Sequence, residues 1–357
     1  MKKIIILSRN SLTLNLFFKE IVKYFEDKNV EVKLSCSDIE NISVNCYDRI
    51  KFRSVSFNNI LFNPFNILFL FFELYSIGKK YKDHVFLINT PLISHLFRFS
   101  TYFMNLKIIY FVHGYRFHDK GNYFLNKFFK FLEIFFSYNT TAYININNFD
   151  YNFTKLILKK KSIKINGVGI DILKKNNNFK NIENNFIVGI IGAYKKNKGY
   201  EDLIKVCINS NIDKNIKFVS FGYGNLNKYL KIKKNNQIKN FELNNFTNDI
   251  YSEIDKFNIL LHLSYREGLP VSLIQCLLRG KPVICYNVRG CKDLIKHDYN
   301  GLVVELGDIN KIIYSINYLK NNNTIIKKMS SNATSSIDYE FSNEFIADSI
   351  YNFINKI

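Results

Sequence analysis

The chain has 357 residues, of which 47% are hydrophobic and 22% charged, which indicates a folded protein with room for two cores rather than a disordered one. Its formal net charge is +20, and residues 1–164 hold 24 basic side chains against 12 acidic ones. Because no nucleic-acid-binding motif accompanies this charge, phosphorylated substrates or an anionic membrane surface are the favoured partners, and nucleic acid is not.

The N-terminal segment and the cysteines both bear on localisation. The apolar run after Lys3 is too short for a signal peptide, and we expect it to be a buried strand of a parallel sheet. The six cysteines have no C-x-x-C spacing and no histidine partners, so we expect no disulfides, as in a reducing cytosol.

Apolar strands alternate with amphipathic helices in the first half of the chain. The predicted strands are 4–7, 30–34, 85–88, 107–112 and 141–144, and the predicted helices are 13–25, 64–80 and 123–137. This alternation is typical of an α/β fold with a parallel sheet, whose ligands bind beyond the carboxyl ends of the strands. The apolar run 67–72 is far shorter than the roughly 20 residues of a membrane span, so we predict no transmembrane helix.

The predicted helix 123–137 interleaves aromatic residues with lysines. Such a pattern is more often a helix whose aromatic face packs in a core. The alternative is a surface that rests on lipid.

A second alternating set follows, with predicted strands at 186–191, 217–221, 259–263 and 282–286. After its first strand comes Gly192-Ala-Tyr-Lys-Lys-Asn-Lys-Gly199, a lysine-rich turn between two glycines that opens a helix. Such a turn is suited to clamp a diphosphate, although a solvated lysine run is the simpler interpretation.

The most informative segment is Glu267-Gly-Leu-Pro270, which lies between a strand and an apolar helix. Pro270 fits the first helical turn, whose free N–H groups attract an anion, and Gly268 permits close approach of a ligand to the backbone. A carboxylate beside such a helix start suits a sugar joined to a phosphate, although a turn of this kind also occurs in many α/β proteins.

Residues 185–310, with Asn287-Val-Arg-Gly290 and Asn300-Gly301 after this motif, resemble the donor-binding half of the retaining glycosyltransferases of family 4. They are most similar to bacterial members that build capsule, O-antigen and other surface polysaccharides. The resemblance implies a GT-B fold, with two Rossmann-like domains whose parallel sheets face a central cleft. We therefore expect an acceptor-side domain at 1–170, a nucleotide-sugar-binding domain at 171–340 and a C-terminal helix at 341–357 that returns to the first domain.

The resemblance also implies roles for individual residues. Glu267 would contact the transferred sugar and Lys198 the leaving nucleotide. His113, in a segment similar to the family's His-Gly segment, would bind a sugar hydroxyl, although a histidine after a strand is more often structural. Supporting contacts to the substrates would come from further residues, namely Gly192, Lys195, Gly199, Gly268, Leu269, Pro270 and Arg116.

Two positions depart from the family pattern. Ala193 stands where the family usually has an arginine, and Gln275 replaces the second glutamate of its E-x7-E pattern, which holds the ribose. Gln275 can still accept a hydrogen bond from one hydroxyl, but it brings no charge.

We therefore expect a cytoplasmic, metal-independent, retaining glycosyltransferase, peripheral on the inner face of the cell membrane. It would transfer a hexose or N-acetylhexosamine from a nucleotide sugar, with UDP favoured, to a polyprenyl-diphosphate-linked saccharide in surface polysaccharide biosynthesis. No cofactor beyond the donor is expected. The alternatives are a nucleotide-sugar epimerase of the same fold and a non-catalytic scaffold or partner protein.

Overall fold

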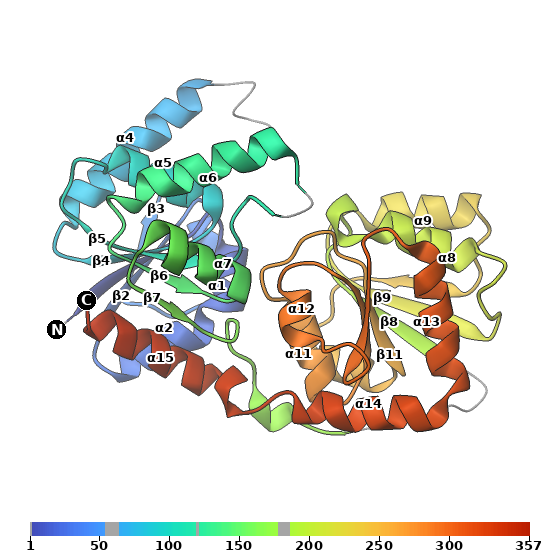
Figure 1. Ribbon diagram of the computed structural model, residues 1–357. Coiled ribbons are helices and arrows are strands. Elements are labelled where there is room, and N and C mark those ends of the chain that lie inside the picture. Colours follow the sequence, from blue (N-terminus) through green and yellow to red (C-terminus); the bar gives the residue numbers. More distant parts are fainter. Residues whose placement is uncertain (1, 54–63, 119–120, 178–185) are drawn as a thin grey trace. The chain divides into compact units, whose positions relative to one another are not determined.

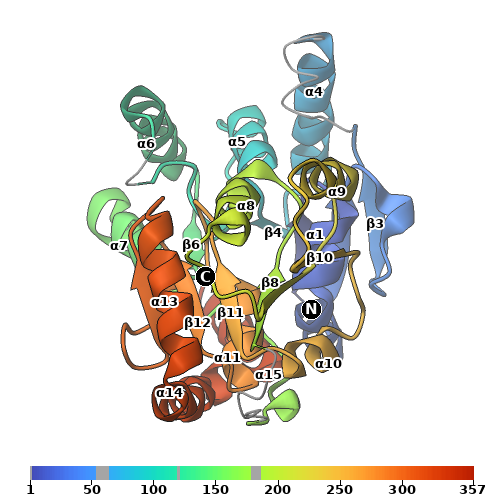
Figure 2. The same cartoon turned by 90° about the vertical axis from the view of Figure 1, so that its right-hand side faces the viewer.

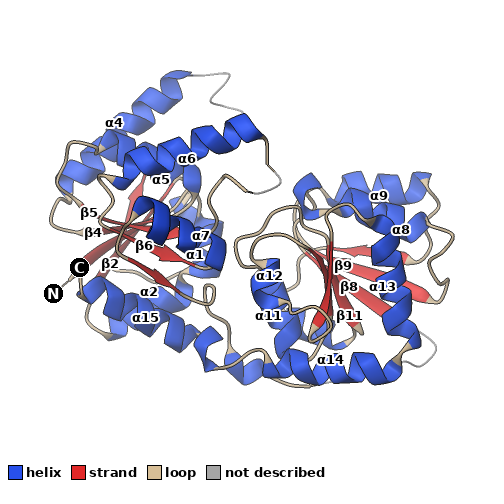
Figure 3. Ribbon diagram, viewed as in Figure 1, coloured by secondary structure: helices blue, strands red, loops and turns tan. Residues whose placement is uncertain are grey.

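The computed structural model describes residues 2–53, 64–118, 121–177 and 186–357 (Figure 1). The chain divides into two compact units. The first comprises Met1–Gly169 together with Glu340–Ile357, and the second comprises Ile170–Tyr339. Each unit is a parallel sheet with helices packed around it (Figure 3).

The first unit holds a seven-stranded sheet in the order β3-β2-β1-β4-β5-β6-β7. All of its neighbouring strands pair in parallel. The strands are β1 (Lys3–Leu7), β2 (Glu31–Cys36), β3 (Asp48–Lys51), β4 (Val85–Ile88), β5 (Lys107–Val112), β6 (Ala142–Asn145) and β7 (Ser162–Lys164). The central strands β1 and β4 are buried almost throughout, which explains their uninterrupted apolar sequences.

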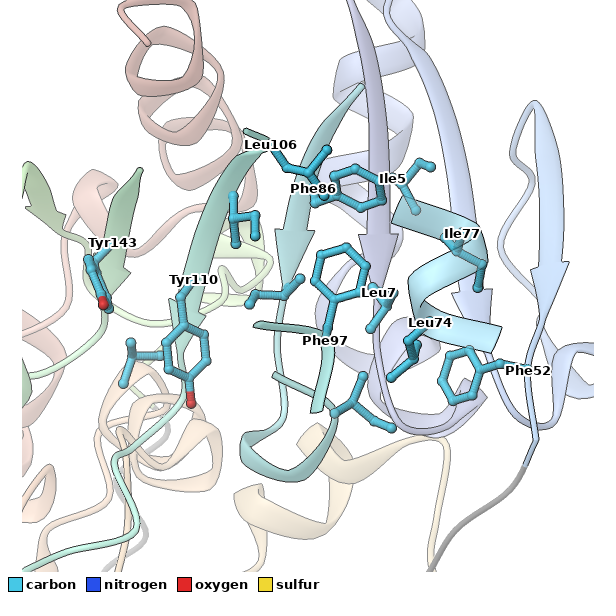
Figure 4. Packing of buried hydrophobic residues seen from close by; sticks show 14 of the residues in the cluster. Ile5, Leu7, Phe52, Leu74, Ile77, Phe86, Phe97, Leu106, Tyr110 and Tyr143 are labelled. Carbon is cyan, nitrogen blue, oxygen red and sulfur yellow. The ribbon is translucent and has the colours of Figure 1, made fainter. Parts of the chain in front are cut away.

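Helices cover both faces of this sheet. They are α1 (Ser11–Phe17), α2 (Lys19–Asp27), α4 (Pro64–Lys80), α5 (Pro91–Ser100), α6 (Tyr123–Ser137), α7 (Asn148–Asn152) and α15 (Asn343–Asn355). On one face, Leu74 and Ile77 of α4 and Phe97 of α5 pack against Leu7 and Phe86 of the sheet (Figure 4). The inner faces of α4 and α5 thus form one core with the strands.

Two predictions for this unit need correction. The predicted helix 13–25 is interrupted at Phe18, whose φ of −119° leaves the helical range while its fully buried ring packs edge-on against Phe111. For α6 the sequence favoured a core-facing helix over a surface that rests on lipid, yet Phe124 and Phe131 are exposed, and of its aromatic residues only Phe136 is buried. The core-facing interpretation therefore holds only for the C-terminal turn of α6.

The second unit holds a six-stranded parallel sheet in the order β10-β9-β8-β11-β12-β13. Its strands are β8 (Phe186–Ile191), β9 (Ile216–Phe221), β10 (Phe241–Asn244), β11 (Ile259–His262), β12 (Val283–Tyr286) and β13 (Gly301–Val304). Its helices are α8 (Tyr200–Ile208), α9 (Leu226–Asn235), α10 (Ile250–Asp255), α11 (Val271–Leu278), α12 (Cys291–Leu294), α13 (Ile309–Asn321) and α14 (Asn323–Ser335).

The C-terminal helix α15 belongs to the first unit, although it follows the second in sequence. It packs against α2, where Tyr351 contacts the rings of Tyr24 and Phe25, and the hydroxyl of Tyr24 donates a 2.7 Å hydrogen bond to Asp348. Ile346, Ile350 and its other buried side chains form the inner face of the helix. The chain therefore passes between the units twice.

Candidate active site

The sheet of the second unit has a topological switch point between β8 and β11. From β8 the chain proceeds outward through β9 and β10, and it then returns to β11 on the other side of β8. The loops that follow these two neighbouring strands diverge at their carboxyl ends, which is where open α/β sheets bind ligands. The lysine-rich turn follows β8 and the Glu267 motif follows β11, so both predicted segments start from this switch point.

Glycines bring these loops into contact. Gly199 has a φ of +74°, and a Cβ atom there would lie 2.0 Å from the carbonyl oxygen of Leu263. A Cβ atom at Gly222, after β9, would lie 2.0 Å from the carbonyl oxygen of Gly192. Side chains at these positions would force the backbones apart, so the glycines are required for the loops to meet.

Lys198 and Glu267 lie in direct contact within this junction. The Nζ atom of Lys198 is paired with Oε1 of Glu267, although the two residues are separated by 69 positions in the sequence. The Nε2 atom of His262, the last residue of β11, lies 3.1 Å from the same carboxylate oxygen. The structure thus combines one carboxylate with two basic side chains, and the Glu267 side chain is only 11% exposed.

In this cluster, Glu267 and His262 each shift the pKa of the other towards the charged form. Burial acts to raise the pKa of Glu267, but the positive charge of Lys198 and the hydrogen bond from His262 outweigh it and hold this pKa well below its usual value. Burial acts to lower the pKa of His262, but its hydrogen bonds with Cys291 and Glu267 raise it to about 9. At neutral pH, Glu267 is therefore a carboxylate and His262 an imidazolium.

The loop that carries Glu267 is fixed on its other side by the segment after β12. Arg289 donates a hydrogen bond from Nε to the backbone oxygen of Glu267 over 3.1 Å. Gly290 has a φ of +78°, and a Cβ atom there would lie 2.0 Å from the oxygen of Gly268. Leu269 is buried, and Pro270 is the N-cap of α11, one position earlier than the sequence predicts. Glu267 is therefore held at the start of α11.

The remaining predicted residues of this unit lie in different surroundings. Lys195 is exposed, with Nζ 5.9 Å from the ring centre of Tyr223, and Gly192 has room for a Cβ atom, which would meet only Lys198 at 3.9 Å. Ala193 is buried. Gln275 lies in the second turn of α11 and hydrogen-bonds Tyr251 of α10.

His113 and Arg116 belong to the first unit and follow β5. The imidazole of His113 packs against the rings of Phe111 and Phe17, with centroids 4.5 and 5.4 Å away, and its Nε2 atom is buried without a hydrogen-bond partner among the described residues. Burial lowers the pKa of His113 to about 3, so it is neutral. The guanidinium of Arg116 lies 4.9 Å from the ring centre of Phe129.

Residues 171–336 match the sequence profile of the family described as Glycosyl transferases group 1. The match coincides with the unit that holds Lys198, His262 and Glu267.

Curated relatives of the chain extend the comparison. The chain is 25% identical over 227 residues to the UDP-Gal:alpha-D-GlcNAc-diphosphoundecaprenol alpha-1,3-galactosyltransferase of Escherichia coli, which covers 58% of the chain and 59% of the relative. It is 28% identical over 192 residues to a poly(ribitol-phosphate) alpha-N-acetylglucosaminyltransferase of Staphylococcus aureus, covering 52% of the chain and 38% of the relative. The chain thus spans less than two thirds of the length of these relatives.

Solved structures match the whole chain. Anabaena HepE in complex with UDP-glucose has a TM-score of 0.77 and 16% identity, and the match covers 100% of both chains. Sucrose-phosphate synthase from Thermosynechococcus elongatus has a TM-score of 0.81 and 13% identity, covering 100% of this chain and 99% of the other. The predicted fold class, GT-B with two Rossmann-like units, is confirmed.

The sequence analysis assigned no role to two residues of the second unit, His262 and Arg289. His262 is the only histidine in the run 257–263, which is apolar apart from His262 and Asn258, and it stands at the carboxyl end of a strand, where ligands bind. Arg289 lies at the equivalent edge, after β12. Polar residues at the ends of apolar strands were the signal that could have identified both.

Proposed function

We propose that the protein is a retaining glycosyltransferase that moves a hexose or N-acetylhexosamine from a UDP-sugar to a polyprenyl-diphosphate-linked saccharide in surface polysaccharide biosynthesis. The observation that carries this proposal is the contact of Lys198 and His262 with Glu267 at the switch point of a group 1 unit. The carboxylate can hold sugar hydroxyls, while the neighbouring cations and the start of α11 stabilise a diphosphate.

Relatives support the choice of donor and acceptor. HepE was solved with UDP-glucose, and the name of the E. coli relative specifies a UDP-sugar donor and a diphosphoundecaprenol-linked acceptor. We therefore assign a UDP-sugar to the second unit and a lipid-linked saccharide as the acceptor. Neutral His113 is assigned to a sugar hydroxyl, for which an uncharged imidazole is a suitable partner.

The proposed reaction needs no covalent intermediate. The bond between the anomeric carbon and the phosphate oxygen breaks, and its electron pair leaves with UDP. The acceptor hydroxyl bonds to that carbon from the same face and passes its proton to the departing phosphate oxygen. Glu267, already paired with Lys198 and His262, is a weak nucleophile and acts by positioning the sugar.

We expect transfer without a metal ion or other cofactor, because basic side chains and the N-terminus of α11 can supply the positive charge that the diphosphate needs. The test incubates the purified protein with single UDP-sugars and a synthetic polyprenyl-diphosphate saccharide, with and without EDTA. UDP release and the anomeric configuration of the product are measured. We expect acceptor-dependent, EDTA-resistant release of UDP and retention of configuration.

Other outcomes of this experiment would contradict the proposal. Conversion of the UDP-sugar without an acceptor would indicate an epimerase. Absence of UDP binding in calorimetry would indicate a non-catalytic partner protein. An inverted product would refute the retaining mechanism while leaving the transferase in place.

A further inference from the structure

The outward side of α4 is apolar. Phe65, Leu68, Phe69, Phe72 and Tyr75 are exposed, and their spacing of three or four residues places them on one stripe of the helix. The opposite stripe, with Leu70 and Leu74, is buried against the sheet. Helix α4 thus presents rings to solvent where an ordinary surface helix presents polar side chains.

Helix α6 repeats this arrangement. Phe124, Phe128 and Phe131 are exposed, and Phe124 reaches 78% exposure. The exposed Lys127 lies within the same stripe, with Nζ 4.8 Å from the ring centre of Tyr123. The exposed side of α6 therefore carries aromatic rings with a lysine between them.

The two stripes are joined through α5. The ring of Phe99, itself exposed, contacts Phe71 of α4 and Phe136 of α6, with centroid distances of 5.5 and 6.3 Å. Phe103, which follows α5, is 99% exposed. Figures 1 and 2 both show α4, α5 and α6 along the same side of the first sheet. We name the exposed apolar side chains of these three helices, together with Phe103, the aromatic face.

The charges around the aromatic face are mostly positive. Lys79, Lys80, Lys127 and Lys130 are exposed. The acidic Glu133 of α6 is buried and paired with Arg98 of α5 over 2.9 Å. Glu73 is the remaining acidic residue of these helices, and it lies 3.6 Å from Nε of Arg53. The face therefore combines a large apolar surface with cations.

We propose that the aromatic face binds an anionic lipid bilayer, with its rings in the interface and its lysines at the headgroups. Exposed apolar patches of this extent are rare on soluble monomers and mark interaction sites. Rings interleaved with lysines are suited to an anionic leaflet. The inference deepens and rests on the proposed function, because a polyprenyl-linked acceptor is held in the same bilayer. No described helix is long and apolar enough to cross a membrane.

The test measures co-sedimentation with vesicles of phosphatidylcholine alone and of phosphatidylcholine with phosphatidylglycerol, at low and high salt. We expect binding to the anionic vesicles, reduced by salt. Replacing two rings, Phe124→Ser with Phe131→Ser, should lower the partition coefficient by about tenfold or more, because their apolar area no longer leaves water. The pair Lys127→Gln with Lys130→Gln should lower it by about tenfold at low salt and little at high salt.

Matched controls are available in the second unit. Phe246→Ser with Tyr314→Ser removes two rings of comparable exposure, and Lys231→Gln with Lys234→Gln removes two exposed lysines at the same helical spacing. Both controls should bind vesicles like the unchanged protein. Thermal unfolding checks that every variant is folded.

Three results would overturn the inference. The first is equal recovery in the supernatant with both vesicle types at low salt. The second is equal loss of binding in the control variants. The third is a concentration-dependent dimer that the ring variant dissociates while vesicles bind neither protein, which would assign the aromatic face to a second copy of the chain. UDP binding is measured in the same preparations, so that vesicle binding without UDP binding would refute the proposed function and leave the lipid surface standing.

Discussion

The two units differ in the side chains that lie at the carboxyl ends of their parallel strands. At the carboxyl edge of the second, Lys198 and His262 share one carboxylate oxygen of Glu267, and the three groups are charged. At the carboxyl edge of the first, His113 is neutral and packed among phenylalanine rings. A similar topology thus places a charged histidine at this edge in one unit and a neutral one in the other.

The two histidines show what decides the difference. Both follow or end a buried strand, and burial acts to lower the pKa of each. His262 has a carboxylate within hydrogen-bonding distance and its pKa rises to about 9, whereas His113 has rings around it and its pKa falls to about 3. The neighbouring side chains, rather than the position in the fold, set the charge.

The largest expected effect is at the charged edge. Glu267→Ala should lower the turnover number by about a hundredfold or more, because a contact made mainly in the transition state is lost. UDP affinity should change far less. Turnover is measured by UDP release with a lipid-linked acceptor, and UDP affinity by calorimetry.

Since Glu267→Ala leaves the partly exposed Lys198 and the buried His262 without their carboxylate, Glu267→Gln provides a second variant that retains a hydrogen-bond acceptor. Glu242→Ala, at an exposed salt bridge with Lys217 on the edge strand, serves as the control and should be nearly fully active. Near-normal turnover of both Glu267 variants would refute the assignment of Glu267 to the active site. It would also remove the proposed functional difference between the carboxyl edges of the two sheets.

A smaller effect is expected from pH. The folded-state pKa of His262 lies above its unfolded value of 6.5, so its contribution to stability is fully present below pH 6.5 and is lost as pH rises through about 9. The free energy of unfolding should fall by on the order of 3 kcal/mol over this window. His113, whose folded pKa is about 3, acts in the opposite sense: it adds stability as pH rises through its unfolded value of 6.5, and little of that rise remains above pH 6.5.

Chemical denaturation across this pH window measures the effect. His262→Gln should flatten the dependence, whereas His113→Gln, which removes only the small residual rise above pH 6.5, should leave it nearly unchanged. A dependence that survives His262→Gln would show that this histidine is not held charged by Glu267.

The smallest effect is expected at Gln275. If it holds the ribose, Gln275→Ala should weaken UDP binding by about 1 kcal/mol, or roughly fivefold, and Gln275→Glu should preserve or tighten it. Calorimetry with UDP provides the measurement. Tyr251→Phe is the matched control, because it removes the hydrogen bond with Gln275 but keeps the amide available to the ribose. Equal weakening by Tyr251→Phe and Gln275→Ala would assign Gln275 a structural role.

The central strands could be predicted because their apolar runs are local and continuous. The strands β3, with the exposed sequence Asp-Arg-Ile-Lys, and β7, with three residues, were not predicted, because each lies at an edge of its sheet and has little apolar surface to bury. The interruption at Phe18 was also missed, since it depends on packing against the distant Phe111. Local patterns therefore identified the cores and not the edges.

In the candidate active site, too, the residues could be predicted from local sequence, whereas their contacts could not. Glu267 and Lys198 could be proposed from their motifs, but their contact joins loops 69 residues apart and depends on close approaches at glycines such as Gly199. The charge of His262 depends on that contact and was not predicted. For α6, the sequence pattern indicates an amphipathic helix without specifying whether the ring-bearing side meets a core or solvent.

The return of α15 to the first unit affects the order in which the protein can fold during synthesis. Residues 170–339 are contiguous, so the second unit can complete its core as soon as it leaves the ribosome. The first unit is translated earlier, yet α2 lacks its packing partner until α15, which follows the whole second unit, has been translated. Until then, Tyr24 and Phe25 lack their contact with Tyr351. The unit that is synthesised first is therefore the one that is finished last.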